Sequence, residues 1–164
     1  MWSVFRKKAP GDSVAIPKES AVILQGESEG FPELQVINQA LDGFAGADGL
    51  PWHLSIIIDM VEKHDVGLPT SSETAVLKEF AKELRRHLEA DSNAAFLASI
   101  TWNGTRQLVF RVRDPEVANA YLSRVTADPS PIRQFDYRME QDAAWTLAEQ
   151  YLEPGRAAKK ERRA

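Results

Sequence analysis

The sequence contains no cysteine, and this absence removes several kinds of site at once. Disulfide frameworks, zinc clusters built on thiolates and thiol nucleophiles all require cysteine, so none of them is available to this chain. No run of apolar residues approaches the ~18 that a membrane-spanning helix needs. Residues 1–8 include basic side chains but no apolar stretch follows them, so we expect no secretory signal and a cytoplasmic protein.

The chain also lacks the motifs that hold nucleotides or metal ions. Segment 43–49 contains three glycines, but their spacing matches neither a Walker loop nor a dinucleotide fingerprint, and no helix pattern follows. Glu62, His64 and Asp65 are potential metal ligands. Three neighbouring loop residues rarely converge on one ion without a further ligand from elsewhere. We therefore expect no cofactor and no metal.

Positive charge is concentrated at the two ends of the chain. The formal net charge is −4 over 164 residues, yet residues 6–8 are all basic and residues 155–164 are strongly basic. The body between them is therefore more acidic than the total. Nucleic-acid affinity comes chiefly from neutralising phosphates, so an acidic body disfavours it. We expect no membrane partner, and nucleic acid only weakly, through the basic tail.

The length fits one domain of ordinary size. A Pro-Gly-Asp sequence at positions 10–12 interrupts any regular pattern, so residues 1–13 are interpreted as a flexible leader. Residues 14–153 carry the apolar periodicity of a single α+β domain. Residues 154–164 begin with proline and glycine and show no apolar periodicity, so we expect a disordered basic tail.

The apolar periodicity of the domain predicts a mixture of strands and helices. Residues 52–61 alternate between the two faces of a strand. Thr70 and Glu73 fit a capping box at the start of a helix with an apolar stripe. Asp114 followed by Pro115 marks the start of a second helix. The other predicted elements are strands at 21–25, 34–41, 94–102, 105–113 and 132–140, and a last helix beginning at Asp142.

Asn103 and Gly104 lie between two apolar strands and predict a hairpin. A two-residue turn would pair Trp102 with Thr105, and it would place the apolar residues of the two strands on opposite faces. A three-residue loop pairs Thr101 with Thr105 and collects the apolar residues on one face. We therefore predict the longer loop, with Gly104 in a bulge.

From residue 52 to 140 the predicted order is strand, helix, strand, strand, helix, strand. This order is typical of the ferredoxin-like split βαβ sandwich, an antiparallel sheet with both helices on one face. We predict this α+β fold for residues 52–140, with an N-terminal hairpin before it and a C-terminal helix after it. The fold hosts many unrelated functions, so it does not identify one.

Alternation places a set of polar side chains on the sheet face opposite the two helices. The candidate ligand- or partner-binding residues on this open face are His53, Ser55, Asp59, Arg111, Arg113 and Arg138. In the ferredoxin-like order the first and third strands are adjacent, so Arg111 and Arg113 are expected near Ser55 and Asp59. Two arginines on a rigid sheet can bind a carboxylate or phosphate bidentately, and salt-bridged surface charges produce the same pattern.

The open face is not polar throughout. Ile57, Leu97 and Val109 interrupt its polarity. We expect the N-terminal hairpin, the last helix or a second subunit to cover that part of the face.

Four short motifs resemble a bacterial family. They are Leu50-Pro51-Trp52, Gly67-Leu68-Pro69, Trp102-Asn103-Gly104-Thr105-Arg106 and Asp142-Ala143-Ala144-Trp145. Across residues 20–152 the chain is similar to the domain of unknown function numbered six-nine-five. That family has no assigned activity or catalytic residues, so the resemblance implies none here. Its members sometimes occur beside a small regulatory domain similar to an inhibitor of ribonuclease E, which favours regulation through protein contact.

Three functions are compatible with these observations. The favoured one is a non-enzymatic regulatory or protein-interaction module that uses the open sheet face. An alternative is a sensor or enzyme for a small anion at the same face, with His53 or Asp59 handling the proton. Another is a structural homodimer that buries the face. No catalytic constellation is recognisable, so enzymatic activity is left open but is not the favoured hypothesis.

Overall fold

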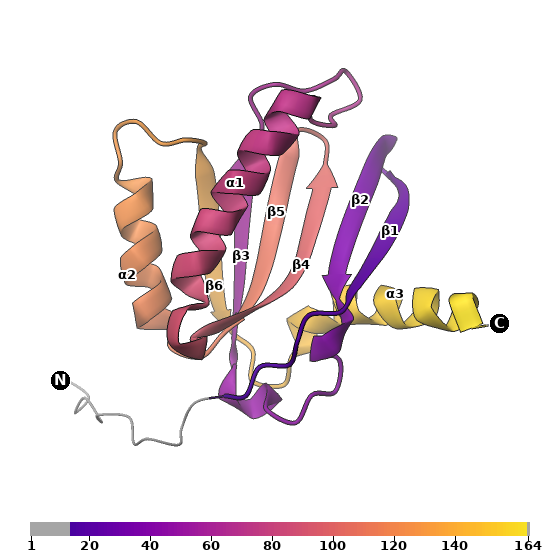
Figure 1. Cartoon of the computed structure of the whole chain (residues 1–164), viewed down its shortest axis with the longest axis vertical. Helices are drawn as coiled ribbons and strands as arrows, with labels where there is room; N and C mark the ends of the chain where they lie inside the picture. Colours follow the sequence, from indigo (N-terminus) through magenta and orange to yellow (C-terminus); the bar gives the residue numbers. More distant parts are fainter. Residues whose placement is uncertain (1–13, 164) are drawn as a thin grey trace.

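The computed structural model describes residues 14–163, so the predicted leader at 1–13 lies outside the described residues. Within that range the chain is an α+β protein built on a six-stranded antiparallel sheet in the order β1-β2-β4-β5-β3-β6 (Figure 1). The strands are β1 (Ala21–Ser28), β2 (Phe31–Asn38), β3 (Trp52–Asp59), β4 (Ala94–Trp102), β5 (Thr105–Val112) and β6 (Phe135–Gln141). The helices are α1 (Ser71–Leu88), α2 (Pro115–Thr126) and α3 (Thr146–Arg163), with short 3-10 turns η1 (Gln39–Leu41), η2 (Ala47–Gly49) and η3 (Ala90–Ser92).

Helices α1 and α2 lie side by side on one face of the sheet (Figure 1). The Thr70 hydroxyl accepts a hydrogen bond from the Glu73 N–H at 3.2 Å, and the Asp114 carboxylate accepts from the first turn of α2, as the sequence predicts. Alternation along β3 directs Leu54, Ile56 and Ile58 toward these helices. The first core therefore lies between α1, α2 and this face.

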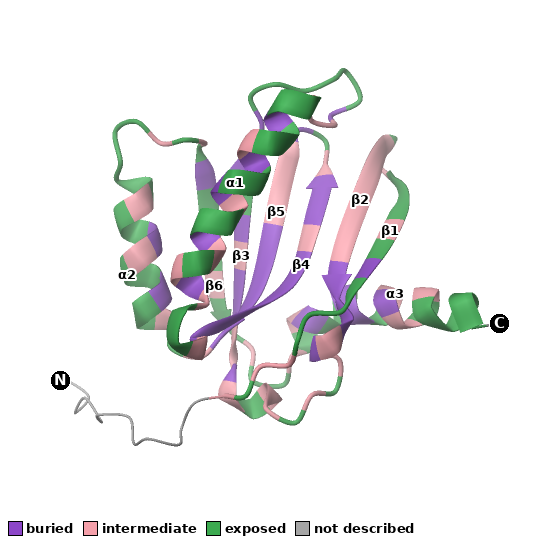
Figure 2. Ribbon diagram, viewed as in Figure 1, coloured by how far each residue is buried: buried purple, intermediate pink, exposed green. Residues whose placement is uncertain are grey.

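A second core lies on the opposite face, under the N-terminal half of α3. It includes Ala148, Tyr151 and Leu152 of α3, packed against Leu97 of β4 and Val109 of β5. Of the three covers considered for the open face, the structure places the last helix there. The N-terminal hairpin instead extends the sheet, because β2 pairs with β4. Strands β4 and β5 are consequently buried over most of their length (Figure 2).

The hairpin between β4 and β5 differs from the prediction. Trp102 pairs with Thr105, so the turn contains only two residues. Asn103 (φ 42°) and Gly104 (φ 81°) are both in the left-handed region, as in a type I′ turn. The register shifts between Phe96 and Ala98, which turns Phe96 toward the first core and Ala98 toward the second. The prediction was wrong because it assumed that only one face of β4 is buried.

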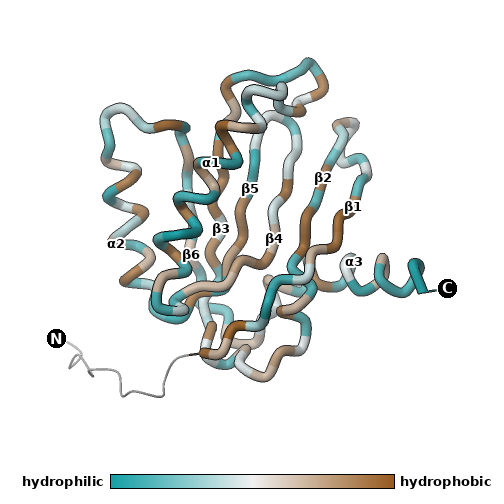
Figure 3. Tube along the Cα trace, viewed as in Figure 1, coloured by the Kyte–Doolittle hydropathy of each residue, from teal (hydrophilic) through white to brown (hydrophobic). Residues whose placement is uncertain are grey.

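Residues 154–163 are helical, although the sequence led us to expect a disordered tail. Helix α3 continues through Pro154 to Arg163. Gly155 lies so close to the Gln39 side chain that a Cβ would clash with it. The Arg156 guanidinium forms an ion pair with Asp42 at 2.7 Å and another with Glu149. These contacts hold the part of α3 that follows Pro154. The last turns of this helix are hydrophilic (Figure 3).

None of the helices in residues 14–163 combines enough length with enough hydrophobicity to cross a membrane.

Candidate functional site

A cavity of about 580 Å³ lies on the face opposite α1 and α2, between β3, β5, β6 and the start of α3. Its floor is formed by buried or half-buried polar side chains, and its mouth by exposed side chains of β6. The lining includes His53, Ser55, Ile57, Gln107, Asp136, Tyr137, Arg138, Glu140, Leu147, Gln150 and Tyr151. This is the face on which alternation placed the candidate residues.

Three of the six candidate residues line the cavity, and three do not. His53, Ser55 and Arg138 line it, while Arg111 lies beside His53 and is fully buried. Asp59 pairs with Thr105 at the far end of β3, six residues from His53 and therefore roughly 20 Å away. Arg113 follows the end of β5, and its N–H bonds to Asn93. We expected Arg111 and Arg113 near Ser55 and Asp59; the antiparallel register places Arg111 opposite His53, Val109 opposite Ser55 and Thr105 opposite Asp59.

Every hydrogen bond of the Arg111 guanidinium goes to another part of the protein. Nη1 donates to the Asp142 carboxylate at 2.8 Å, and Nη2 donates to the carbonyls of Asp142 at 2.6 Å and Leu50 at 3.2 Å. The guanidinium also lies 4.5 Å from the centre of the Trp145 ring. Arg111 therefore positions the loop between β6 and α3, and its two Nη groups are already engaged.

Asp142 links this network to the start of α3. Its carboxylate accepts hydrogen bonds from the N–H groups of Thr146 at 3.0 Å and Leu147 at 2.9 Å. These are free donors of the first helical turn, so the carboxylate caps the helix while it pairs with Arg111. The ion pair thereby fixes where α3 leaves the sheet, and with it the wall of the cavity.

His53 is held as a neutral hydrogen-bond donor. Burial, together with the neighbouring positive charge of Arg111, lowers the pKa of His53 to about 4. Nδ1 lies 3.2 Å from Nη1 of Arg111, which can only donate, so Nδ1 accepts and the proton resides on Nε2. The imidazole stacks on the ring of Tyr151, and the two ring centres are 6.2 Å apart. With this pKa His53 is a weak base near neutral pH, which disfavours a proton-handling role.

Ser55 and Tyr151 add two further donors to the cavity. Gln107 Nε2 donates to the Ser55 Oγ at 2.6 Å and to the Tyr151 hydroxyl oxygen at 3.4 Å. Because both hydroxyl oxygens accept from the same amide, their own protons are free to point elsewhere. Burial raises the pKa of Tyr151, so its hydroxyl keeps that proton at neutral pH. The cavity thus presents uncharged donors from β3 and α3.

Tyr151 and Gln150 were missed by the sequence analysis of this site. Alternation assigns strand residues to a face, but it does not say where a separate helix will pack. The apolar stripe of the last helix, which includes Leu152, was the available signal that it covers a sheet. That stripe did not indicate which face would receive it.

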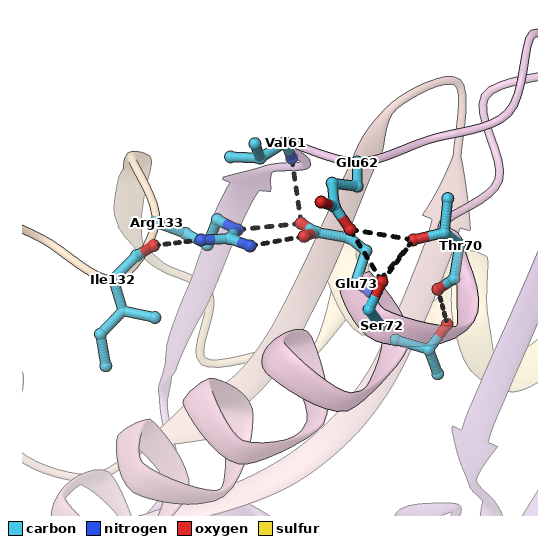
Figure 4. A network of polar contacts seen from close by, with 8 residues as sticks. Val61, Glu62, Thr70, Ser72, Glu73, Ile132 and Arg133 are labelled. Carbon is cyan, nitrogen blue, oxygen red and sulfur yellow. Dashed lines mark hydrogen bonds and ion pairs between the residues drawn. The ribbon is translucent and has the colours of Figure 1, made fainter.

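A second polar network lies at the other end of β3 (Figure 4). The Glu73 carboxylate accepts from the Val61 N–H at 3.0 Å and from Arg133 Nε at 2.9 Å, and Arg133 lowers the pKa of Glu73 to about 2. The predicted capping box is therefore only half formed, since this carboxylate does not return to Thr70. Glu62 accepts from Ser72 at 2.8 Å. Within residues 14–163 no three His, Asp or Glu side chains gather as a metal site requires.

The fold and cavity define an α+β protein with a polar hollow on one sheet face, uncharged at its floor and charged at its mouth. A family model described as a family of unknown function (DUF695) matches residues 23–153, and the chain belongs to this family. The resemblance drawn from the four sequence motifs is thereby confirmed. No curated protein and no solved structure gives a significant match.

Proposed function

We propose that this protein is a non-enzymatic interaction module that binds a partner polypeptide at the cavity of the open sheet face. One observation carries the proposal: the cavity presents uncharged donors, while the buried cation beside it is already paired. The donors are the Nε2–H of His53 and the hydroxyls of Ser55 and Tyr151, and the paired cation is Arg111. Uncharged donors match a peptide carbonyl, whereas a buried anion requires a cation that is free to pair with it.

The free edge of the sheet supports a polypeptide as the ligand. Strand β6 ends the strand order, so its outer backbone groups have no neighbouring strand within residues 14–163. The exposed residues at the mouth of the cavity, Asp136, Arg138 and Glu140, belong to the same strand. An extended segment that pairs with a free edge gains main-chain hydrogen bonds, and pockets beside the edge select its side chains.

The small-anion alternative has weaker support. Arg111 is paired and does not line the cavity. The arginine that lines it is Arg138, whose side chain is 80 % exposed and whose Nη1 lies 3.6 Å from a carboxylate oxygen of Glu140. An exposed cation next to a carboxylate contributes little binding energy to a ligand anion.

Site-specific photocrosslinking tests the proposal. A photoreactive residue replaces Arg138 or Gln150 in cells that naturally produce the protein, and a control replaces the exposed Val117 on α2. We expect both cavity positions to crosslink to the same polypeptide, and the control not to do so. Crosslinks to a second copy of this chain would instead support the homodimer. Equal crosslinking from all three positions, or none, would overturn the proposal.

Two matched substitutions then examine the donors themselves. Ser55→Ala combined with Tyr151→Phe removes both hydroxyls with little change in shape. We expect the affinity for the crosslinked segment to fall about 30-fold, since two hydrogen bonds of about 1 kcal/mol each are lost. Tyr121→Phe is the control, because this tyrosine lies on α2, on the other face of the sheet, and does not line the cavity. An unchanged affinity of the double variant would show that the donors do not contact the partner.

We also infer a ferredoxin-like topology for residues 52–140. The strand order β4-β5-β3-β6 and the position of α1 and α2 on one face support it. We also propose that the protein is cytoplasmic, as expected from the sequence. Cell fractionation followed by immunodetection tests this location.

A further inference from the structure

A second groove, of about 530 Å³, lies on the other face of the sheet, between α1 and strands β4 and β5. Its apolar surface comes from Ala81 of α1, Phe96 of β4 and Leu108 of β5. Its volume falls within the range of small-molecule sites, about 300–1,000 Å³. No residue of this groove takes part in the cavity on the open face.

A partly buried arginine lies at one end of the groove without a carboxylate partner. Arg106 Nε donates to the Thr101 hydroxyl at 3.1 Å, and neither Nη nitrogen has a hydrogen bond or ion pair with residues 14–163. The charge of Glu73 acts on Arg106, but that carboxylate is bonded to Arg133. Burying a cation costs free energy unless it is paired, so the partly buried and unpaired Arg106 favours the binding of an anion.

Helix α1 supplies further cations along the same groove. Lys78 and Lys82 line it, and neither forms an ion pair within the described chain. Arg85, one turn further, is bonded to Glu89 and lies 4.4 Å from the centre of the Phe96 ring. The free positive charge of the groove therefore comes from Arg106, Lys78 and Lys82, whereas Arg85 at the Phe96 end is neutralised.

We propose that this groove binds an amphiphilic carboxylate, with its head on Arg106 and Lys78 and its alkyl chain over Leu108, Ala81 and Phe96. The two free Nη groups of Arg106 match the two oxygens of a carboxylate. From Lys78 to Arg85 the helix rises about 10 Å, which is the length of a chain of about eight carbons. The ligand class is therefore a medium-chain fatty acid or a molecule with the same charge and apolar body.

Three eight-carbon probes test the charge and the chain together. Octanoate, 1-octanol and octyltrimethylammonium are titrated into the full chain by calorimetry, and NMR shift mapping locates the bound probe. We expect octanoate to bind at least tenfold more tightly than octanol, to perturb the amides of Leu108 and Phe96, and to leave those of His53 and Tyr151 unchanged. Butyrate, which has the same head but a shorter chain, is expected to bind at least tenfold more weakly than octanoate.

Three substitutions separate recognition from folding. Arg106→Met keeps the apolar stem but removes the charge, and we expect it to abolish the preference for octanoate over octanol. Arg86→Met, on the solvent side of α1 beside Glu83, is the control and is expected to bind octanoate normally. Ser99→Phe fills the groove without touching the cation, and it is expected to block all three probes. Equal affinity for octanoate and octanol, or undiminished octanoate binding by folded Arg106→Met, would overturn the proposal.

Discussion

The imidazole of His53 is kept neutral by its surroundings, and this makes stability depend on pH. Its pKa in the folded protein, about 4, lies below the ordinary 6.5, so the fold favours the uncharged ring. This contribution is fully present above pH 6.5 and is lost as the pH falls from 6.5 to 4. His53→Gln keeps an oxygen acceptor for Arg111 but cannot gain that proton.

We therefore expect the wild type to lose stability relative to His53→Gln between pH 7 and pH 4, by about 3 kcal/mol at most. Urea unfolding at a series of pH values measures the difference. An NMR titration of the ring provides the independent check. A midpoint near 6.5 would contradict the buried, arginine-paired geometry.

The pKa of the buried Glu73 carboxyl is also lowered, but here the fold favours the charged form. Arg133 lowers its pKa from 4.5 to about 2, so its stabilisation is present above pH 4.5 and is lost as the pH falls toward 2. Glu73→Gln leaves the Arg133 guanidinium without its counter-charge, and we expect it to lower the free energy of unfolding by about 3 kcal/mol at pH 7. Glu79→Gln, an exposed position on the same helix, should change it by less than about 0.5 kcal/mol.

The pH dependence of unfolding shows whether Glu73→Gln acts through the lost charge or through the changed shape of the side chain. The difference in the free energy of unfolding between wild type and Glu73→Gln should decrease when chemical unfolding is repeated from pH 5 down to pH 2. A gap of constant size would mean that the ion pair with Arg133 is not its source.

At the scale of elements, the loop before α1 is joined to the tip of the β4–β5 hairpin. The Gly104 N–H donates to the Gly67 carbonyl at 2.8 Å, and its carbonyl accepts from Met60 at 2.9 Å. Gly67 has φ +83°, and a Cβ there would lie 2.6 Å from Cα of Asn103. Both the left-handed backbone and this approach exclude a side chain.

Gly67→Ala is therefore expected to destabilise the protein by about 2–3 kcal/mol, measured by chemical unfolding. Gly26→Ala is the matched control, because a Cβ at Gly26 meets nothing within 4 Å. That control should change stability by less than about 1 kcal/mol. Equal effects of the two substitutions would show that the loop and the hairpin are not tightly joined.

The sequence predicted those elements whose signals are local. Thr70 and Asp114 locate the starts of α1 and α2, because an N-cap bonds to its own next turn. The alternation of β3 likewise depends on neighbouring residues alone. The bulge near Leu97 and the helical turns after Pro154 depend on partners far away in the chain, Val109 for the former and Asp42 for the latter. No local pattern reports such partners.

At the scale of the whole molecule, the sheet separates two cores that meet through β4 and β5. Alternation alone placed His53, Ser55 and Arg138 on the correct face, and they line one cavity. The sequence could not show that Asp142 neutralises Arg111, because that pairing depends on the path of the loop between β6 and α3. The charge of the site was therefore the part of the prediction that required the three-dimensional structure.

The bulge between Phe96 and Ala98 has a consequence for insertions and deletions. Removing Leu97 would leave Phe96 opposite Phe110 and Ala98 opposite Val109, so both side chains would keep their faces. Inserting one residue elsewhere in β4 would instead exchange the side chains destined for the two cores along the rest of the strand. Such a length change is therefore far more damaging than most single substitutions there. The turn at Glu29 and Gly30, at the exposed end of the β1–β2 hairpin, is free of this constraint. It is the place where the chain can accept a tag or an additional loop.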